Sequence, residues 1–159
     1  MRKFIFILIF FFSSCKFYKL KHTNIELIIQ DAGSYRYDFK KEIYTVFSID
    51  KSPIEIKFEL SNEEKKGINE KYYELHLNKL PAKVSIEGDC MISPAFFTTL
   101  YIKRDSSMQE IQIESGCRDY NLFNRGKAER INNFLKYIYK IVKVKPEIKN
   151  SPKSNIHYM

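Results

Sequence analysis

The sequence predicts an α+β domain with a mainly antiparallel sheet of about six strands, two helices and one disulfide. Three observations support this fold class. Runs that alternate between apolar and polar residues follow one another in the first part of the chain, as strands joined by short turns do. Apolar residues recur with helical spacing in only two segments. The resulting order, β-β-β-β-α-β-β-α, lacks the βαβαβ alternation that builds a parallel sheet.

Residues 25–60 predict four strands in a simple antiparallel meander. NIELIIQDAGSYRYDF gives two of them around an Asp-Ala-Gly-Ser turn, and EIYTVFSID and SPIEIKFELS give the other two. The fourth strand has the clearest alternation, in which apolar residues take turns with charged ones: Ile54, Ile56, Phe58 and Leu60, with Glu55, Lys57 and Glu59. This pattern predicts a strand with one buried face and one face in solvent.

The period changes to that of a helix in LSNEEKKGINEKYYELHLNKLP. Ser61 and Glu64 form a capping box, in which each side chain satisfies a backbone N–H at the start of the helix. Pro81 ends the helix, and Gly67 weakens its middle by up to about 1 kcal/mol relative to alanine. One helical face is apolar: Ile68, Tyr72 and Leu75. We expect the acidic residues of this segment to form a solvated helix face and no catalytic carboxylate pair.

The second half of the chain predicts a hairpin and a second helix. AFFTTLYIK and EIQIES are the two strands of the hairpin. Two faces alternate along the first of them: Phe96, Thr98, Leu100 and Ile102 on one, Phe97, Thr99 and Tyr101 on the other. RDYNLFNRG is expected to be a loop. KAERINNFLKYIYKIVK is the most amphipathic segment, and we expect its apolar stripe to pack on the sheet.

The N-terminus has the layout of an export signal that ends in a lipidation site. Arg2 and Lys3 precede an apolar run of nine residues, about half the length needed to span a bilayer. Phe12-Ser13-Ser14-Cys15 resembles the lipobox of bacterial lipoproteins, although leucine is usual where Phe12 stands. The alternative is an ordinary secretory signal with an incidental cysteine. Acyl chains on Cys15 would tether the folded chain to a membrane, since several chains bind far more tightly than one.

These features divide the chain into four parts. Residues 1–14 are the expected signal peptide, 15–24 a lipidated tether, 25–145 a single α+β domain and 146–159 an extended C-terminal tail. The expected location is the bacterial cell envelope. Lys16 in place of an aspartate argues against retention in the inner membrane, and no acidic run of the kind associated with surface export follows Cys15. A lipoprotein of the outer membrane that faces the periplasm is therefore the default expectation.

Cys90 and Cys117 remain after lipidation and predict a disulfide in an oxidising compartment. A bond between them would close a loop of about 26 residues and stabilise the fold by about 3.5 kcal/mol in the chain-entropy model. The alternative is a reactive or metal-binding pair. The chain has no C-x-x-C motif, and its three histidines keep no ligand spacing with either cysteine. We therefore expect neither a metal nor another cofactor.

Composition is that of an ordinary globular domain, with 44% apolar and 29% charged residues in 159. The formal net charge of +8 falls to +6 without the first fourteen residues, because that segment holds two cations and no acid. A basic surface would favour anionic headgroups or an acidic protein partner. The alternative is that the abundant lysine reflects the codon usage of an AT-rich genome and that the basic charge has no function. A nucleic acid partner is not expected for an exported chain.

Several short motifs, in this order, resemble small uncharacterised lipoproteins of Bacteroidota. They are LSNEEKKGI, then LP, then a cysteine with SP shortly after it, then SGC, a C-terminal helix and KPEIKNSPKS, over residues 55–154. The resemblance implies an exported protein with a two-cysteine core. It implies no known activity and no catalytic residue.

Three functions remain open at this point. The first is a non-enzymatic protein-binding module, such as an inhibitor, an immunity-type protector or an assembly accessory. The second is a carrier of lipid or glycan with an aromatic-lined groove: Tyr35, Tyr37, Tyr44, Phe96, Phe97 and Tyr101. The third is an envelope hydrolase, but the chain has no G-x-S-x-G and no H-E-x-x-H motif. A flat sheet face would favour the binding module, a deep apolar cavity the carrier and a polar cleft the enzyme.

The candidate interface lies beside the two cysteines, where a disulfide would gather polar residues from distant parts of the chain. It consists of five residues: Asp89, Ser93, Arg118, Asp119 and Tyr120. Arginine and tyrosine dominate the energetics of protein interfaces, so Arg118 and Tyr120 are the expected anchors.

Overall fold

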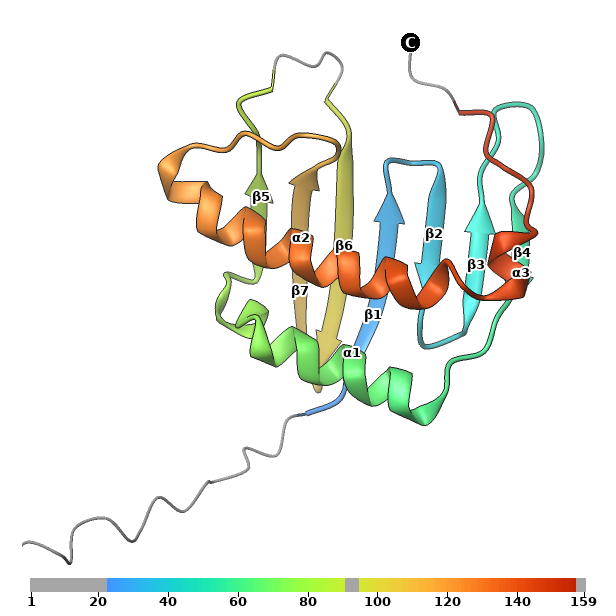
Figure 1. Ribbon diagram of the computed structural model, residues 1–159, viewed down its shortest axis with the longest axis horizontal. Helices are drawn as coiled ribbons and strands as arrows, with labels where there is room; N and C mark the ends of the chain where they lie inside the picture. The colour runs from blue at the N-terminus through green and yellow to red at the C-terminus, as the bar shows by residue number, and fades with distance from the viewer. Residues whose placement is uncertain (1–22, 91–94, 157–159) are drawn as a thin grey trace, which may run out of the picture.

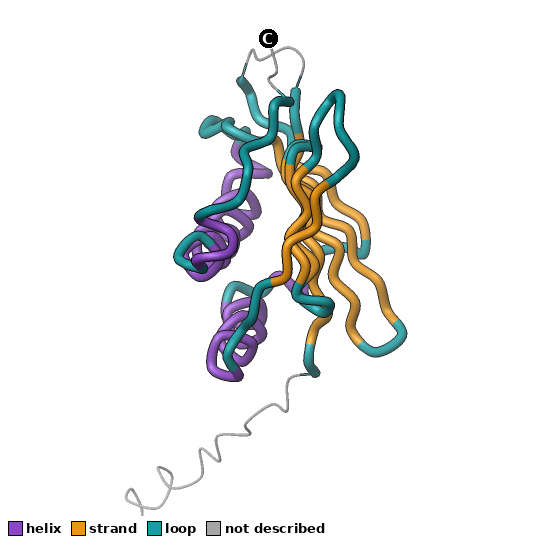
Figure 2. Tube along the Cα trace, turned by 90° about the vertical axis from the view of Figure 1, so that its right-hand side faces the viewer, coloured by secondary structure: helices purple, strands orange, loops and turns teal. Residues whose placement is uncertain are grey.

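The computed structural model describes residues 23–90 and 95–156. They form a seven-stranded sheet with its helices on one side (Figures 1 and 2). The elements in chain order are β1 (Ile25–Asp31), β2 (Tyr35–Asp38), β3 (Ile43–Val46), β4 (Ile54–Lys57), α1 (Asn62–Glu74), the 3₁₀ helix η1 (Leu77–Lys79), β5 (Lys83–Ile86), β6 (Phe97–Arg104), β7 (Ser107–Glu114), α2 (Leu122–Val142) and α3 (Pro146–Lys149). The predicted α+β class with a mainly antiparallel sheet is confirmed. No helix among the described residues is both long and apolar enough to cross a membrane.

The sheet joins the two predicted antiparallel units side by side. Its strand order is β4-β3-β2-β1-β6-β7-β5. The first four strands form the predicted meander, and β6 and β7 form the predicted hairpin. The two units meet where β1 pairs antiparallel with β6 over seven residue pairs, from Ile25 opposite Arg104 to Asp31 opposite Thr98. The centre of the sheet therefore depends on contacts between distant parts of the chain.

β5 is a seventh strand that the alternation pattern does not predict. It lies at the edge of the sheet and pairs parallel with β7, with Val84 opposite Ile111. Only Val84 and Ile86 of this four-residue strand face the core, which is too short a pattern to distinguish a strand from a loop.

The helices begin and end at recognisable local signals. Both hydrogen bonds of the predicted capping box are present, from the Glu64 N–H to Ser61 Oγ (3.1 Å) and from the Ser61 N–H to Glu64 Oε2 (2.8 Å). α1 ends before Pro81, because His76 adopts a left-handed conformation (φ 54°). α2 begins five residues before the predicted helix, since the Asn121 side chain caps it by accepting a hydrogen bond from the Asn124 N–H.

The segment after α2 is less extended than predicted. Residues 146–149 form the short helix α3, which buries Ile148. The Ser154 side chain is also buried and donates a hydrogen bond to the Phe47 carbonyl (2.7 Å), while its N–H donates to the Tyr35 hydroxyl (3.2 Å). The described part of the C-terminal segment is thus attached to the meander end of the sheet.

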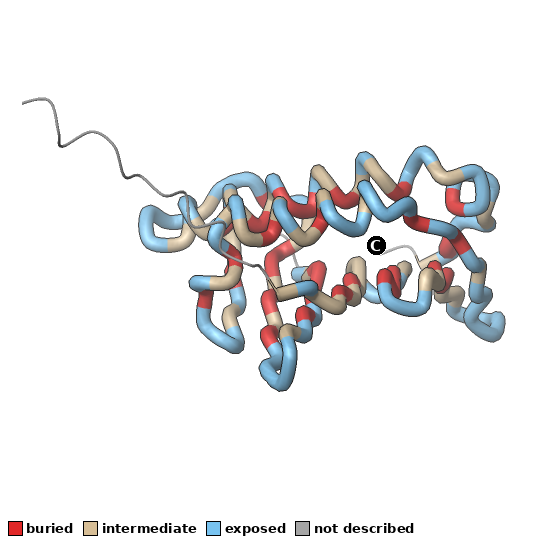
Figure 3. The backbone as a smooth tube through the Cα atoms, turned by 90° about the horizontal axis from the view of Figure 1, so that it is seen from below, coloured by how far each residue is buried: buried red, intermediate tan, exposed pale blue. Residues whose placement is uncertain are grey.

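The core lies between the helix layer and one face of the sheet (Figure 3). α1 and α2 cross the strands side by side and in opposite directions (Figure 1). They bury their apolar stripes: Ile68 and Tyr72 from α1, and Ala128, Ile131, Phe134, Leu135, Ile138 and Val142 from α2. Gly67 lets the two helices approach closely, because the Tyr137 hydroxyl occupies the space that a Cβ at position 67 would need.

Candidate functional site

The face of the sheet away from the helices is not covered by any described element (Figure 2). The register sets which side chains lie on it, because every second residue of a strand points the same way. One row crosses all seven strands: Lys57, Ile43, Asp38, Ile28, Tyr101, Glu110 and Lys83. The parallel row above it is polar: Glu55, Thr45, Arg36, Gln30, Thr99, Gln112 and Ser85. We call this surface the open face.

Two large apolar side chains are accessible on the open face. Tyr101 of β6 is 37% exposed, and Met108 of β7 is 57% exposed. Met108 stands opposite Lys103 in the hairpin, one row below Tyr101. Both line a hollow of about 260 Å³ together with the partly buried Ile28 of β1. An apolar floor in the middle of a polar face is the usual anatomy of a protein interface.

The rim of this hollow is more basic than acidic. Glu26 is neutralised by Lys40 at 2.7 Å and approached by Lys103 at 3.9 Å. The hydrogen bond from Lys40 is the largest influence on the Glu26 carboxyl, and its pKa lies below the ordinary value. Arg36 and Lys41 also line the hollow, and among the described residues no carboxylate lies within ion-pair distance of either. Their charges are available to a partner.

The disulfide predicted between Cys90 and Cys117 is present, with Cα atoms 5.7 Å apart. The two chain segments that it joins are braced by further contacts. The Gly88 N–H donates to the buried carboxylate of Glu114 (2.7 Å), and the Asp89 N–H donates to the Asp119 carbonyl (2.8 Å). A Cβ at position 88 would overlap Cys117, so only glycine fits. The disulfide and these contacts together join residues 88–90 to residues 114–119.

Four of the five predicted interface residues lie on these two segments. Asp89, Arg118 and Asp119 are exposed. Tyr120 is half-buried, and its hydroxyl donates to the Cys117 carbonyl (3.0 Å), so it also supports the loop. Ser93 lies outside the described residues.

Two apolar residues next to this loop were not predicted to be exposed. Leu122 and Phe123 form the first turn of α2, and each is 88% exposed. The sequence places them in a loop, where apolar residues carry no periodicity that would reveal their orientation. They add a small apolar patch to the first turn of α2, and α2 begins at the β5 edge of the molecule (Figure 1).

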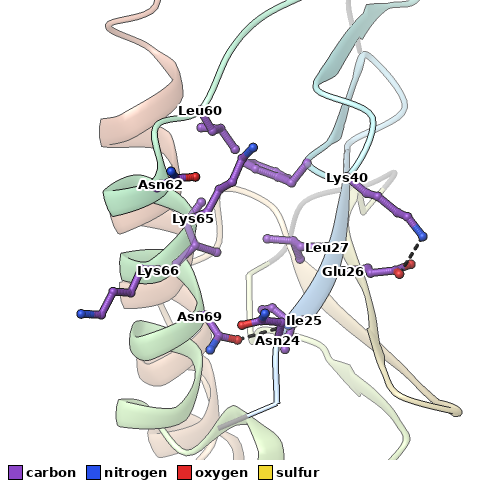
Figure 4. A pocket seen from close by; sticks show the side chains of 12 residues that line it. Asn24, Ile25, Glu26, Leu27, Lys40, Leu60, Asn62, Lys65, Lys66 and Asn69 are labelled. Carbon is purple, nitrogen blue, oxygen red and sulfur yellow. Dashed lines mark hydrogen bonds and ion pairs between the residues drawn. The ribbon is translucent and has the colours of Figure 1, made fainter.

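A second hollow lies at the opposite end of the strands, between α1 and β1 (Figure 4). Its volume is about 480 Å³. The apolar part of its lining comes from five residues: Ile25, Leu27, Phe39, Leu60 and Ile68. Its polar part includes Asn69, whose Oδ1 accepts a hydrogen bond from the Ile25 N–H (3.2 Å), and Lys65, which is ion-paired with Glu42 at 2.9 Å. Asn69 and Lys65 thus already hold α1 to β1 and to the turn before β3.

The aromatic residues proposed for a carrier do not line one groove. Tyr37 and Tyr44 are buried in the core with their ring centroids 4.8 Å apart, and Tyr35 stacks on Tyr44. Burial raises the pKa of the Tyr44 hydroxyl to about 12, and it raises the pKa of Tyr37 further. Tyr101 lies on the opposite face of the sheet. The six aromatic side chains are thus divided between the two faces.

Polar side chains also gather beneath α2, near the disulfide end. Thr98 Oγ1 donates to Asp31 Oδ1 (2.9 Å) and lies 2.9 Å from Ser115 Oγ. The Tyr139 hydroxyl is buried beside them and makes no well-formed hydrogen bond to the described residues. Burial, followed by the charge of Asp31, raises the pKa of Tyr139 far above the physiological range. In the described part of the chain, no three His, Cys, Asp or Glu residues are grouped so that they could hold a metal ion.

No described protein family matches the chain, and no curated protein or solved structure matches it significantly. Its surfaces are therefore the basis for a functional assignment.

Proposed function

We propose that this protein is a non-enzymatic protein-binding module that is anchored in the cell envelope through lipidated Cys15 and binds its partner on the open face. The observation that carries the proposal is the one-sided arrangement of the helices. It leaves a sheet face on which Tyr101 and Met108 are accessible among polar side chains. Tyrosine, methionine and arginine are enriched at the centres of protein interfaces.

The size of the open face is compatible with this function. The six spacings of about 4.8 Å between the seven strands, with a mean strand length of about 18 Å, give roughly 500 Å². A standard interface buries about 800 Å² on each partner. The open face and the turns around it would therefore supply one side of such an interface.

The position of the chain ends supports access to this face. β1 starts at Ile25 at the end of the strands opposite the disulfide (Figure 1). The open face runs along the strands from that end to the disulfide end, so the described chain that leads back towards Cys15 leaves from the edge of this face and not from its middle.

Site-specific photocrosslinking in cells tests the binding surface. A benzophenone amino acid at Tyr101 should give a crosslinked protein adduct that mass spectrometry identifies. The matched control carries the same amino acid at Asn133, which is exposed on α2 on the other side of the molecule. Adducts from both positions, or from Asn133 alone, would contradict the proposal.

Membrane attachment is tested separately. Cys15→Ser should abolish the incorporation of labelled fatty acid and release the protein from the membrane fraction. A wild-type protein that takes up no label, with a mutant that still fractionates with membranes, would rule out the lipid anchor. This outcome would leave the crosslinking result intact.

A further inference from the structure

We infer that the partner inserts an acidic segment, with an apolar side chain beside its carboxylates, into the hollow of the open face. This inference rests on the proposed function, because it specifies what the same surface recognises. It starts from a contrast within the hollow. The floor is apolar (Ile28, Tyr101 and Met108), whereas the rim is formed largely by cations.

Charge in the hollow is unbalanced. Four basic side chains line it: Arg36, Lys40, Lys41 and Lys103. Two carboxylates oppose them, and both are already engaged. Glu26 binds Lys40 at 2.7 Å, and the buried Asp38 accepts a hydrogen bond from the Lys41 N–H at 2.9 Å.

The two cations without a carboxylate partner stand on the same side of the floor. Arg36 belongs to β2, next to Gln30 of β1 and Thr45 of β3, and neither neighbour carries a charge. Lys41 follows in the turn between β2 and β3. An arginine guanidinium binds a carboxylate through two parallel hydrogen bonds, which gives direction as well as affinity. A partner carboxylate is therefore the group that this part of the hollow fits.

The dimensions favour a peptide segment over a small molecule. A volume of about 260 Å³ is below the roughly 300–1,000 Å³ of small-molecule sites, but it accommodates one or two side chains of a partner. A polyanion such as a nucleic acid fits less well, because Glu26 and Asp38 lie in the hollow and its floor is apolar. An apolar side chain would cover Tyr101 and Met108 while an adjacent carboxylate reaches Arg36.

Selection from a displayed library of random peptides tests this inference. The bait is the chain from Lys16 onward, which contains every described residue. Selected peptides should be enriched in aspartate and glutamate next to an aliphatic or aromatic residue. Their affinity, measured by fluorescence polarisation, should fall by at least tenfold with Arg36→Glu and should weaken with added salt.

Lys136→Glu is the matched control, because Lys136 is exposed on α2 and the reversal changes net charge by the same amount. It should leave the affinity within about twofold of wild type. Selected peptides without acidic enrichment, no enrichment at all, or equal binding to Arg36→Glu would overturn the inference. If any of these results were found while Tyr101 still gave a crosslinked adduct, the open face would remain an interface, but for a partner of different charge. Loss of crosslinking would instead reject the proposed function itself.

Discussion

Gln109 is the buried polar residue whose removal should cost the most stability. It lies on the core face of β7 and is 3% exposed. Its Nε2 carries two N–H groups, which are shared among three carbonyls in the turn after α1, those of Leu77 (3.1 Å), Leu80 (3.0 Å) and Pro81 (3.3 Å). Its Oε1 accepts a hydrogen bond from the Tyr72 hydroxyl (2.8 Å). One amide thus holds η1 and α1 to the sheet.

Gln109→Leu keeps the side chain's approximate volume but removes every one of these contacts. The Pro81 carbonyl is near solvent and can be hydrated, whereas the Leu77 and Leu80 carbonyls and the Tyr72 hydroxyl are buried. Each buried group without a partner costs about 1–3 kcal/mol, so the free energy of unfolding should fall by at least about 3 kcal/mol. This is a large part of the 5–15 kcal/mol typical of a domain.

Urea unfolding followed by far-UV circular dichroism measures the loss. Gln112→Leu is the matched control on the same strand, because Gln112 points to the open face and its side chain makes one hydrogen bond, to Glu110 (3.0 Å). It should cost less than about 1 kcal/mol. Equal costs for the two variants would refute the assignment of Gln109 as the polar support of the helix layer.

Three further predictions concern stability. Gly67→Ala should gain up to about 1 kcal/mol of helix propensity only in a Tyr137→Phe background, where the nearest remaining ring atom would be 3.5 Å from the new Cβ. In the wild-type background the Tyr137 hydroxyl must move to make room for the new Cβ. The two substitutions should therefore be coupled in a double-mutant cycle measured by urea unfolding, and the absence of coupling would contradict the close approach of the helices. Cys90→Ala should lower the free energy of unfolding by about 2–5 kcal/mol under non-reducing conditions, and an unchanged urea midpoint would show that the disulfide contributes little. Burial raises the pKa of Glu64, but the ion pair with Lys145 at 2.7 Å and the Ser61 N–H outweigh it and hold the pKa below its ordinary value. The ionised Glu64 therefore stabilises the fold fully above about pH 4.3, and this stabilisation is lost as the pH falls through the pKa of Glu64 in the folded state. Glu64→Gln should make the urea midpoint depend less on pH in this range. An unchanged pH dependence would argue against a stabilising role for the Glu64 carboxylate.

Local patterns predict the individual strands and helices because they report burial directly. Alternation identified the meander, and the Ser61–Glu64 pair identified the start of α1. β5 escaped prediction since its stability comes from β7, a distant segment, and not from its own four residues. The start of α2 escaped because Leu122 and Phe123 occupy a first turn that faces solvent.

The candidate site was predicted only in part, for a different physical reason. Any fold with a disulfide between Cys90 and Cys117 places Asp89 close to Asp119, so the predicted disulfide also predicted this proximity. The alternation pattern predicts that Phe97, Thr99 and Tyr101 lie on the same face of the sheet. It does not predict which face the helices cover, because that depends on how α1 and α2 dock. The open face, and the role of Tyr120 as a support, therefore needed the three-dimensional structure.

The pairing of β1 with β6 has a consequence for the order in which the chain folds. β1 to β4 are contiguous in sequence and form a local meander, but the second edge of β1 is satisfied only by β6, which follows α1 and β5 in the chain. A chain that is synthesised with its N-terminus first presents the backbone donors and acceptors of β1 before β6 is available. During that interval β1 is an unprotected edge strand, open to pairing with other chains. The arrival of the hairpin, and not the formation of the meander, would then end the period in which the protein is most prone to aggregate.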